Sequence, residues 1–242
     1  MYFPRRHCLV LSVASVTLGC TILGCAILPG APAAAPPQEA TPEETIAFFR
    51  GKGMTVLTFV GFSGNGYEDN DRMLAEAAAI LAGHDPRTTI VNLGATKEGI
   101  GAIYGIARQR GFFTTGIVST RARDEQVPLS PFVDRVFYVR DESWGGYVEG
   151  IRRLSPTSTA MVGASDVMVG IGGGDIARDE LIAARQQQKT VRFIDADMNR
   201  RTAREAARRK GLPEPTDFRG SASAAFAGAA DAAPAPGQPS RR

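Results

Sequence analysis

Short apolar runs alternate with longer amphipathic stretches through the middle of this chain. Each run is rich in Val, Ile, Leu and Phe, which favours a β-strand, and each stretch repeats its apolar residues at the spacing of a helix. The expected strands cover residues 55–61, 88–94, 114–120, 134–140, 165–171 and 190–195. The expected helices cover residues 72–83, 99–111, part of 146–164, 176–188 and 199–211.

The order of these elements predicts the architecture. Strands that are apolar throughout, rather than at every second position, are buried on both faces, as in a parallel sheet between helices. Regular alternation of strand and helix is typical of a doubly wound α/β domain with a mainly parallel sheet. We expect one such domain over residues 41–211. It begins at a helix entry in which Thr41 is the N-cap, Pro42 lies in the first turn and Glu44 completes a capping box.

The first 40 residues have the layout of an export leader. Arg5 and Arg6 precede a long apolar run, which is followed by small residues and prolines. Within the run, "ILGC" resembles a bacterial lipobox and predicts lipid attachment at Cys25, which would hold the protein on a membrane in the periplasm or cell envelope. Cleavage after "APA" and an uncleaved anchor are the alternatives. Translation from Met54 would instead leave the protein in the cytoplasm.

The C-terminal residues differ from the body in composition. Residues 212–242 are dominated by Ala, Pro, Gly and Ser and contain few side chains that a core could bury. Such composition predicts a disordered tail.

Composition excludes several kinds of chemistry. All three cysteines lie in the leader, so the body has no cysteine nucleophile and no thiolate metal ligand. His84 is the only histidine of the body, which makes a metal site or a Ser-His-Asp triad unexpected, and we expect no cofactor. A net charge of +3 gives no sign of a nucleic-acid partner. A homodimer is left open.

Three glycine-rich segments follow predicted strands: "GFSGNGYED" (61–69), "GATKEGIG" (94–101) and "GIGGGDIA" (170–177). In a doubly wound sheet, ligands bind beyond the carboxyl ends of the strands, where unpaired N–H groups of helix N-termini attract anions and glycine allows close approach. One such segment alone would indicate only a tight turn. Three of them predict a nucleotide or another phosphorylated small molecule as ligand.

No segment fits the P-loop or a dinucleotide-binding fingerprint, which argues against an ATPase or an NAD dehydrogenase. Tyr67 and Trp144 could stack on a base, with core or loop packing as the alternative. The candidate residues for binding the ligand or its phosphate are Gly61, Ser63, Gly64, Asn65, Gly66, Gly94, Thr96, Gly99, Gly101, Gly172, Gly173, Gly174 and Asp175.

Residues 92–120 and 165–181 resemble the Rossmann-like superfamily that joins the LONELY GUY phosphoribohydrolases, formerly called lysine decarboxylases, with the nucleotide-binding domain of DNA-processing protein A. "GIGA" at 99–102 matches the family's glycine-rich helix start. Gly173 and Gly174 match the glycine pair of its Pro-Gly-Gly-x-Gly-Thr-x-x-Glu motif, and Glu180 matches the closing glutamate. The resemblance implies a Rossmann-like fold over about residues 55–195 and a catalytic role for Glu180.

The chain departs from the family at positions that matter for catalysis. The motif's proline is missing, and Ile176 and Ala177 replace its third glycine and its threonine. If Met161 takes the place of the methionine in the family's Arg-Lys-x-x-Met segment, Thr157 and Ser158 stand where the arginine and lysine would be.

The family's hydrolysis of a ribose N-glycosidic bond relies on that arginine together with the glutamate. Arg178 is a candidate substitute, as are Arg152 and Arg153. The sequence therefore favours an exported or membrane-tethered domain that binds a nucleotide derivative without efficient catalysis. An active phosphoribohydrolase that uses Glu180 on nucleoside 5′-monophosphates, and a scaffold that has lost its pocket, are the alternatives.

Overall fold

A computed structural model describes residues 37–151 and 153–227 of the protein. The predicted leader with Cys25, and the tail beyond residue 227, lie outside these residues, so export and lipid attachment stay predictions. Within the described ranges, no helix is long and apolar enough to span a bilayer.

The described residues contain one seven-stranded sheet in which every neighbouring pair is parallel. The strands, in the spatial order β1-β5-β4-β3-β2-β6-β7, are β1 (Gln38–Ala40), β2 (Thr55–Gly61), β3 (Thr89–Leu93), β4 (Phe113–Ser119), β5 (Arg135–Val139), β6 (Val167–Ile171) and β7 (Thr190–Ile194). The α-helices are α1 (Pro42–Lys52), α2 (Asn70–Ala82), α3 (Ile103–Gln109), α4 (Thr120–Asp124), α5 (Pro156–Ala164), α6 (Asp175–Gln186) and α7 (Arg200–Arg209), and two 3₁₀ helices are η1 (Gly99–Ala102) and η2 (Ala222–Phe226).

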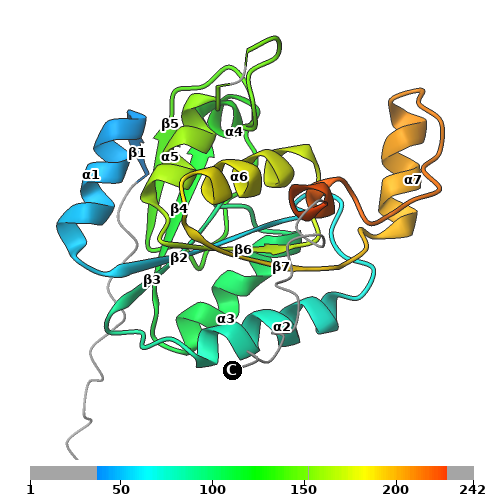
Figure 1. Ribbon diagram of the computed structural model, residues 1–242. Helices are drawn as coiled ribbons and strands as arrows, with labels where there is room; N and C mark the ends of the chain where they lie inside the picture. Colours follow the sequence, from blue (N-terminus) through cyan, green and yellow to red (C-terminus); the bar gives the residue numbers. More distant parts are fainter. Residues whose placement is uncertain (1–36, 152, 228–242) are drawn as a thin grey trace, which may run out of the picture. The chain divides into compact units, whose positions relative to one another are not determined.

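Helices cover both faces of the sheet (Figure 1). Helices α1, α5 and α6 pack on one face, where Val56 and Val60 of β2 point. Helices α2 and α3 pack on the other face, where Leu57 and Phe59 of the same strand point. Because successive residues alternate between the two cores, β2 carries apolar side chains on both faces, with Thr55 and Thr58 as its polar residues. Burying each apolar side chain contributes about 1.5–3 kcal/mol. The expected doubly wound, Rossmann-like α/β fold is confirmed.

The order of the strands places a topological switch point beside β2. From β2 the chain moves through α2 to β3 on one side, whereas β6 pairs with β2 on the other side and leads through α6 to β7. The loops after β2 and β6 therefore diverge, which leaves a crevice at the carboxyl ends of these strands.

The domain begins slightly earlier than expected. The capping box at the start of α1 is present, because the Thr41 hydroxyl accepts from the Glu44 N–H at 3.1 Å and the Glu44 carboxylate accepts from the Thr41 N–H at 2.8 Å. Before it, β1 pairs with β5 and forms the edge of the sheet. The boundary predicted at residue 41 therefore omits one strand.

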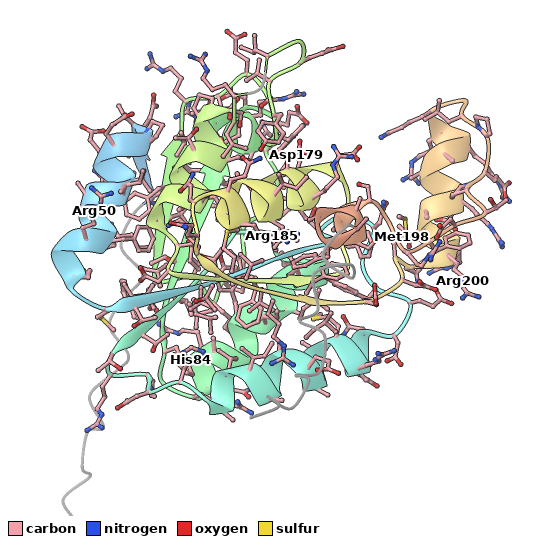
Figure 2. The ribbon with its side chains drawn as sticks, in the orientation of Figure 1. Arg50, His84, Asp179, Arg185, Met198 and Arg200 are labelled. Atoms are coloured by element: carbon pink, nitrogen blue, oxygen red, sulfur yellow. The ribbon has the colours of Figure 1, made fainter. Side chains whose placement is uncertain are left out.

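The expectation of disorder is wrong for residues 212–227. The small side chains Ala222 and Ala225 are buried, and η2 packs on α6. Phe226 stacks on Phe193 of β7 with the ring centroids 5.4 Å apart. The guanidinium of Arg185, a residue of α6 (Figure 2), lies over the Phe226 ring. Alanine supplies little apolar area, yet its small size permits the close contact with α6 that orders this segment.

Candidate functional site

A cleft of about 750 Å³ opens at the carboxyl ends of β2, β3 and β4, beside the first turns of α6. It lies at the switch point of the sheet, where the fold leaves its crevice. Three glycine-bearing loops, from different parts of the sequence, meet there as the sequence predicted. The predicted residues that line the cleft are Gly61, Ser63, Gly64, Asn65, Gly94, Thr96, Gly174, Asp175 and Glu180.

The remaining predicted glycines lie behind the cleft wall, where they let the loops pack. Gly99 has φ +58°, and a Cβ there would collide with the carbonyl oxygens of Phe62 and Ser63. Ile100 donates its N–H to the same Phe62 carbonyl at 2.7 Å, which joins the loop after β3 to the loop after β2. Gly101 packs against the Thr96 carbonyl, and Gly66 lies at a turn with φ +65°.

The glycine triplet after β6 has two different roles. Gly172 and Gly173 have φ values of +53° and +125°, which side chains rarely adopt. A Cβ on Gly173 would lie 2.7 Å from the Cβ of Ala177 and 3.3 Å from the Cα of Gly61. These two glycines therefore shape the turn, and only Gly174 lines the cleft.

The N-terminus of α6 faces the cleft. Gly174 is the N-cap and supplies no side-chain hydrogen bond, and the following residues Asp175, Ile176 and Ala177 also line the cleft. The first N–H groups of a helix lack partners within it and carry a partial positive charge. Elsewhere on its wall the cleft is lined by the basic Lys97 and Lys210 and by the acidic Glu98. The partial charge and the open N–H groups make the α6 end the part of the cleft best suited to an anion such as a phosphate group.

Glu180 is the most perturbed titratable group on the cleft wall. It is 4% exposed, and the Ser158 hydroxyl donates to its Oε1 at 2.7 Å. Burial raises the pKa of Glu180 to about 7, although the hydrogen bond from Ser158 lowers it and the charge of Asp179 raises it further. A carboxyl group with such a pKa is partly protonated at neutral pH, so it can donate or accept a proton.

A loop closes over the Ser158–Glu180 pair. The Ser158 hydroxyl accepts from the N–H of Gly146 at 2.7 Å. Gly145, with φ +130°, lies so close that a Cβ there would be 2.9 Å from the Ser158 Oγ and 3.9 Å from the Glu180 Oε1. The loop is held from below by Asp141, whose carboxylate accepts from the N–H groups of Ser143 and Thr157, at 2.8 and 2.9 Å.

Hydrogen bonding also sets the charge of that supporting carboxylate. Burial raises the pKa of Asp141, but the bonds from the Thr157 and Ser143 amides outweigh it, so the pKa is lowered. Asp141 therefore stays ionised at neutral pH, whereas Glu180 on α6 is partly protonated there.

Arg178 does not line the cleft. Its guanidinium is paired with Asp175 at 2.7 Å and with Asp179 at 2.8 Å, and these bonds raise its pKa. Asp179, which lies on α6 (Figure 2), also accepts the Tyr147 N–H at 2.9 Å. These ion pairs and hydrogen bonds hold α6 against the loop before α5. Arg178 therefore stabilises this contact and does not contribute to the cleft.

The two aromatic residues considered from the sequence have different positions. Tyr67 is buried, where its hydroxyl accepts from the Phe62 N–H at 3.1 Å and donates to the Ile171 carbonyl at 2.7 Å. Its hydrogen bonds join the end of β2 to the end of β6, and its buried ring has no face available to stack on a base. Trp144 lines the cleft and is 38% exposed.

Several residues of the site were missed by sequence reasoning, namely Ser158 as the partner of Glu180, the covering glycines 145 and 146, and the two cleft lysines. "SWGG" at 143–146 is rich in glycine like the three segments from which the site was predicted, so this loop was recognisable from the sequence. Thr157 also lines the cleft, and its buried Oγ1 has no hydrogen-bond partner among the described residues. Across the same residues, no cluster of three or more His, Cys, Asp or Glu is arranged to hold a metal ion.

No protein-family model and no curated protein matches the chain. Among solved structures, a structural-genomics target called TM1055 is 20% identical, with a TM-score of 0.42 over 57% of this chain and 72% of that one. The molybdenum cofactor carrier protein of Chlamydomonas reinhardtii is 18% identical, with a TM-score of 0.42 over 58% of this chain and 76% of that one. Another structure of that carrier protein is 17% identical, with a TM-score of 0.41 over 74% and 99% of the two chains. Similarity at this level leaves the function and the ligand of this chain undetermined.

Proposed function

We propose that the cleft binds a nucleotide or a phosphorylated nucleotide derivative. The observation that carries this proposal is the uncapped N-terminus of α6, which faces a cleft lined by glycine-bearing loops from three parts of the chain. Helix N-termini of this kind bind phosphate groups in many α/β proteins. We place the binding domain outside the cytoplasm or on a membrane on the basis of the leader sequence alone, and the mass of the mature N-terminal peptide tests that placement.

The size of the cleft supports a ligand of this class. Small-molecule sites measure about 300–1,000 Å³, and this cleft has about 750 Å³. Among the described residues the cleft stays open to this extent, which speaks against a scaffold that has lost its pocket.

The charge distribution supports binding more than efficient hydrolysis. If Met161 corresponds to the methionine of the similar family, Thr157 stands where that family has its arginine. Arg178 is paired with two aspartates. Among the described residues, no arginine lines the cleft with Glu180 to hold the ligand in a reactive position.

The first prediction concerns the two cleft lysines. Replacing both Lys97 and Lys210 by alanine is expected to weaken binding of adenosine 5′-monophosphate about tenfold at low salt, since each exposed charge contributes up to about 1 kcal/mol. The difference should shrink at high salt because the charges are screened. Isothermal titration calorimetry with nucleoside mono- and diphosphates and ADP-ribose measures it.

A control removes one lysine charge away from the cleft, and the single variants Lys97→Ala and Lys210→Ala are compared with it. Lys52 is exposed on α1 and does not line the cleft, so Lys52→Ala should leave the affinity unchanged. If none of the phosphorylated ligands binds the unaltered protein, the proposed function is wrong.

The second candidate function is hydrolysis of the N-glycosidic bond of a nucleoside 5′-monophosphate. Glu180 favours it, because burial brings its pKa to about 7 and the side chain lines the cleft. Incubation with adenosine 5′-monophosphate should then release adenine, and Glu180→Gln should reduce the rate about a hundredfold or more. Glu43→Gln, an exposed change on α1, should not. Chromatography for free adenine measures the rate. If Glu180→Gln releases adenine as fast as the unaltered protein does, Glu180 takes no part in the reaction.

A further inference from the structure

We propose that the cleft holds the base of its ligand by stacking on Trp144, and that this stacking is nearly indifferent to which purine is bound. The inference rests on the proposed function, because it assumes a phosphorylated ligand with a planar ring.

Exposed apolar side chains are concentrated at this cleft. In residues 37–151 and 153–227, the exposed large apolar side chains are Val127, Phe132, Trp144, Ile151, Ile176 and Leu212. Val127, Trp144 and Ile176 all line the cleft. Apolar groups left in contact with water inside a concave site indicate a surface that a ligand covers.

The indole of Trp144 is held in place. The Arg121 guanidinium lies 5.1 Å from the centroid of the indole ring, and Arg121 is itself held by the Glu125 carboxylate, with Nε 3.0 Å from Oε1. A cation on one ring face restricts the side chain and leaves the opposite face for a ligand. Trp144 therefore offers a pre-oriented stacking surface.

The stacking surface lies beside the phosphate end of the cleft. Gly145, the residue after Trp144, lies so close to α6 that a Cβ would be 3.0 Å from the Cγ2 of Ile176 and 3.9 Å from the Glu180 Oε1. Trp144 is therefore the chain neighbour of the residue that contacts the first turns of α6. Glu180 and Thr157 also line the cleft, and the Thr157 hydroxyl has no hydrogen-bond partner among the described residues, so these groups could accept from or donate to ribose hydroxyls.

The segment that follows Arg121, the residue over the indole of Trp144, supplies few side chains that could read the edge of a base. From this segment Ala122, Val127, Pro128 and Leu129 line the cleft, and they have no polar side-chain atoms. The hydroxyl of Ser119 already donates to the Asp141 carbonyl at 2.9 Å. Every base has a π-face, so stacking without edge contacts tolerates different bases. Adenosine and guanosine 5′-monophosphates should therefore bind with affinities that agree within about threefold.

The experiment compares a ligand that has a base with one that lacks it. Trp144 is the single tryptophan of the chain, so its fluorescence reports on this position alone. Adenosine 5′-monophosphate should change that fluorescence, whereas ribose 5-phosphate should bind about tenfold more weakly and change it little. Calorimetry gives both affinities without optical interference.

Variants then assign the difference to the ring. Trp144→Ala should weaken adenosine 5′-monophosphate binding about tenfold and leave ribose 5-phosphate binding unchanged, and Trp144→Phe should retain most of the affinity. Phe132→Ala is the control, because Phe132 is 50% exposed but does not line the cleft. Thermal unfolding of each variant verifies that it is folded.

The outcomes separate the inference from the function on which it rests. If neither ligand binds the unaltered protein, the proposed function fails. If both ligands bind and Trp144→Ala still prefers adenosine 5′-monophosphate over ribose 5-phosphate as strongly as the unaltered protein does, the proposed function stands and stacking on Trp144 is overturned. Strong discrimination between adenosine and guanosine 5′-monophosphates would overturn the claim of indifference.

Discussion

Glu180→Gln is expected to make the protein more stable above neutral pH, although it alters a residue of the cleft. In the folded state, burial raises the pKa of Glu180 from 4.5 to about 7. The stability that comes from the protonated carboxyl is present in full below pH 4.5 and is lost as the pH rises through about 7. The loss amounts to about 3 kcal/mol.

Glutamine stays neutral at every pH in this range, and its carbonyl oxygen can still accept the hydrogen bond from Ser158. The free energy of unfolding of Glu180→Gln should therefore be close to that of the unaltered protein at pH 5 and higher by up to about 3 kcal/mol at pH 8. Urea unfolding at several pH values between 5 and 8 measures the difference. The exposed variant Glu43→Gln should show no such dependence. A difference between Glu180→Gln and the unaltered protein that does not change with pH would mean that Glu180 titrates normally.

Gly99→Ala is expected to cost about 3 kcal/mol or more of stability. Gly99 combines a left-handed φ of +58° with direct contact to two backbone carbonyls, those of Phe62 and Ser63. Backbone strain of this type costs about 1–3 kcal/mol, and a clash with main-chain atoms adds to it because a side-chain rotation cannot relieve it. Relief requires the loop to shift, which would break the bond from Ile100 to Phe62 and spread the cleft.

Gly94→Ala provides the matched comparison. Gly94 belongs to the same loop and lines the cleft, but its φ is not left-handed and nothing lies within 4 Å of a Cβ placed there. The free energy of unfolding of Gly94→Ala should differ from that of the unaltered protein by less than about 0.5 kcal/mol. Chemical denaturation of both variants tests the contrast, and equal stability for the two would show that the loops can separate without cost.

The strands were predictable because burial on both faces leaves a simple signal. The run at 55–61 is apolar and ends in a glycine, and β2 spans Thr55–Gly61. The helix expected over 99–111 is instead a 3₁₀ turn followed by α3, because Gly99 takes a left-handed conformation at its start. Helix propensity along the chain does not reveal the contact of Gly99 with the carbonyls of Phe62 and Ser63, because these residues belong to a different loop.

The site was predictable in position but only partly in chemistry. Glycine loops at strand ends located the cleft, since the fold places all those ends together. The pairing of Glu180 with Ser158, 22 residues away, depends on how α5 packs beside α6, which a linear pattern does not contain. The ion pair of Arg178 with Asp175 was within reach, because Asp175 lies three residues before it, a spacing at which side chains on a helix meet. The pair with the neighbouring Asp179 has no such signal in the sequence.

The segment that ends in η2 affects the order in which the protein can be completed. Ala222 donates its N–H to the Gly173 carbonyl at 3.0 Å, so a residue synthesised after every strand supports the turn from which α6 begins. During translation, earlier segments emerge and fold first. A nascent chain can therefore assemble the whole sheet before this turn receives its outer support, and ligand capture would be the last ability that the emerging protein acquires.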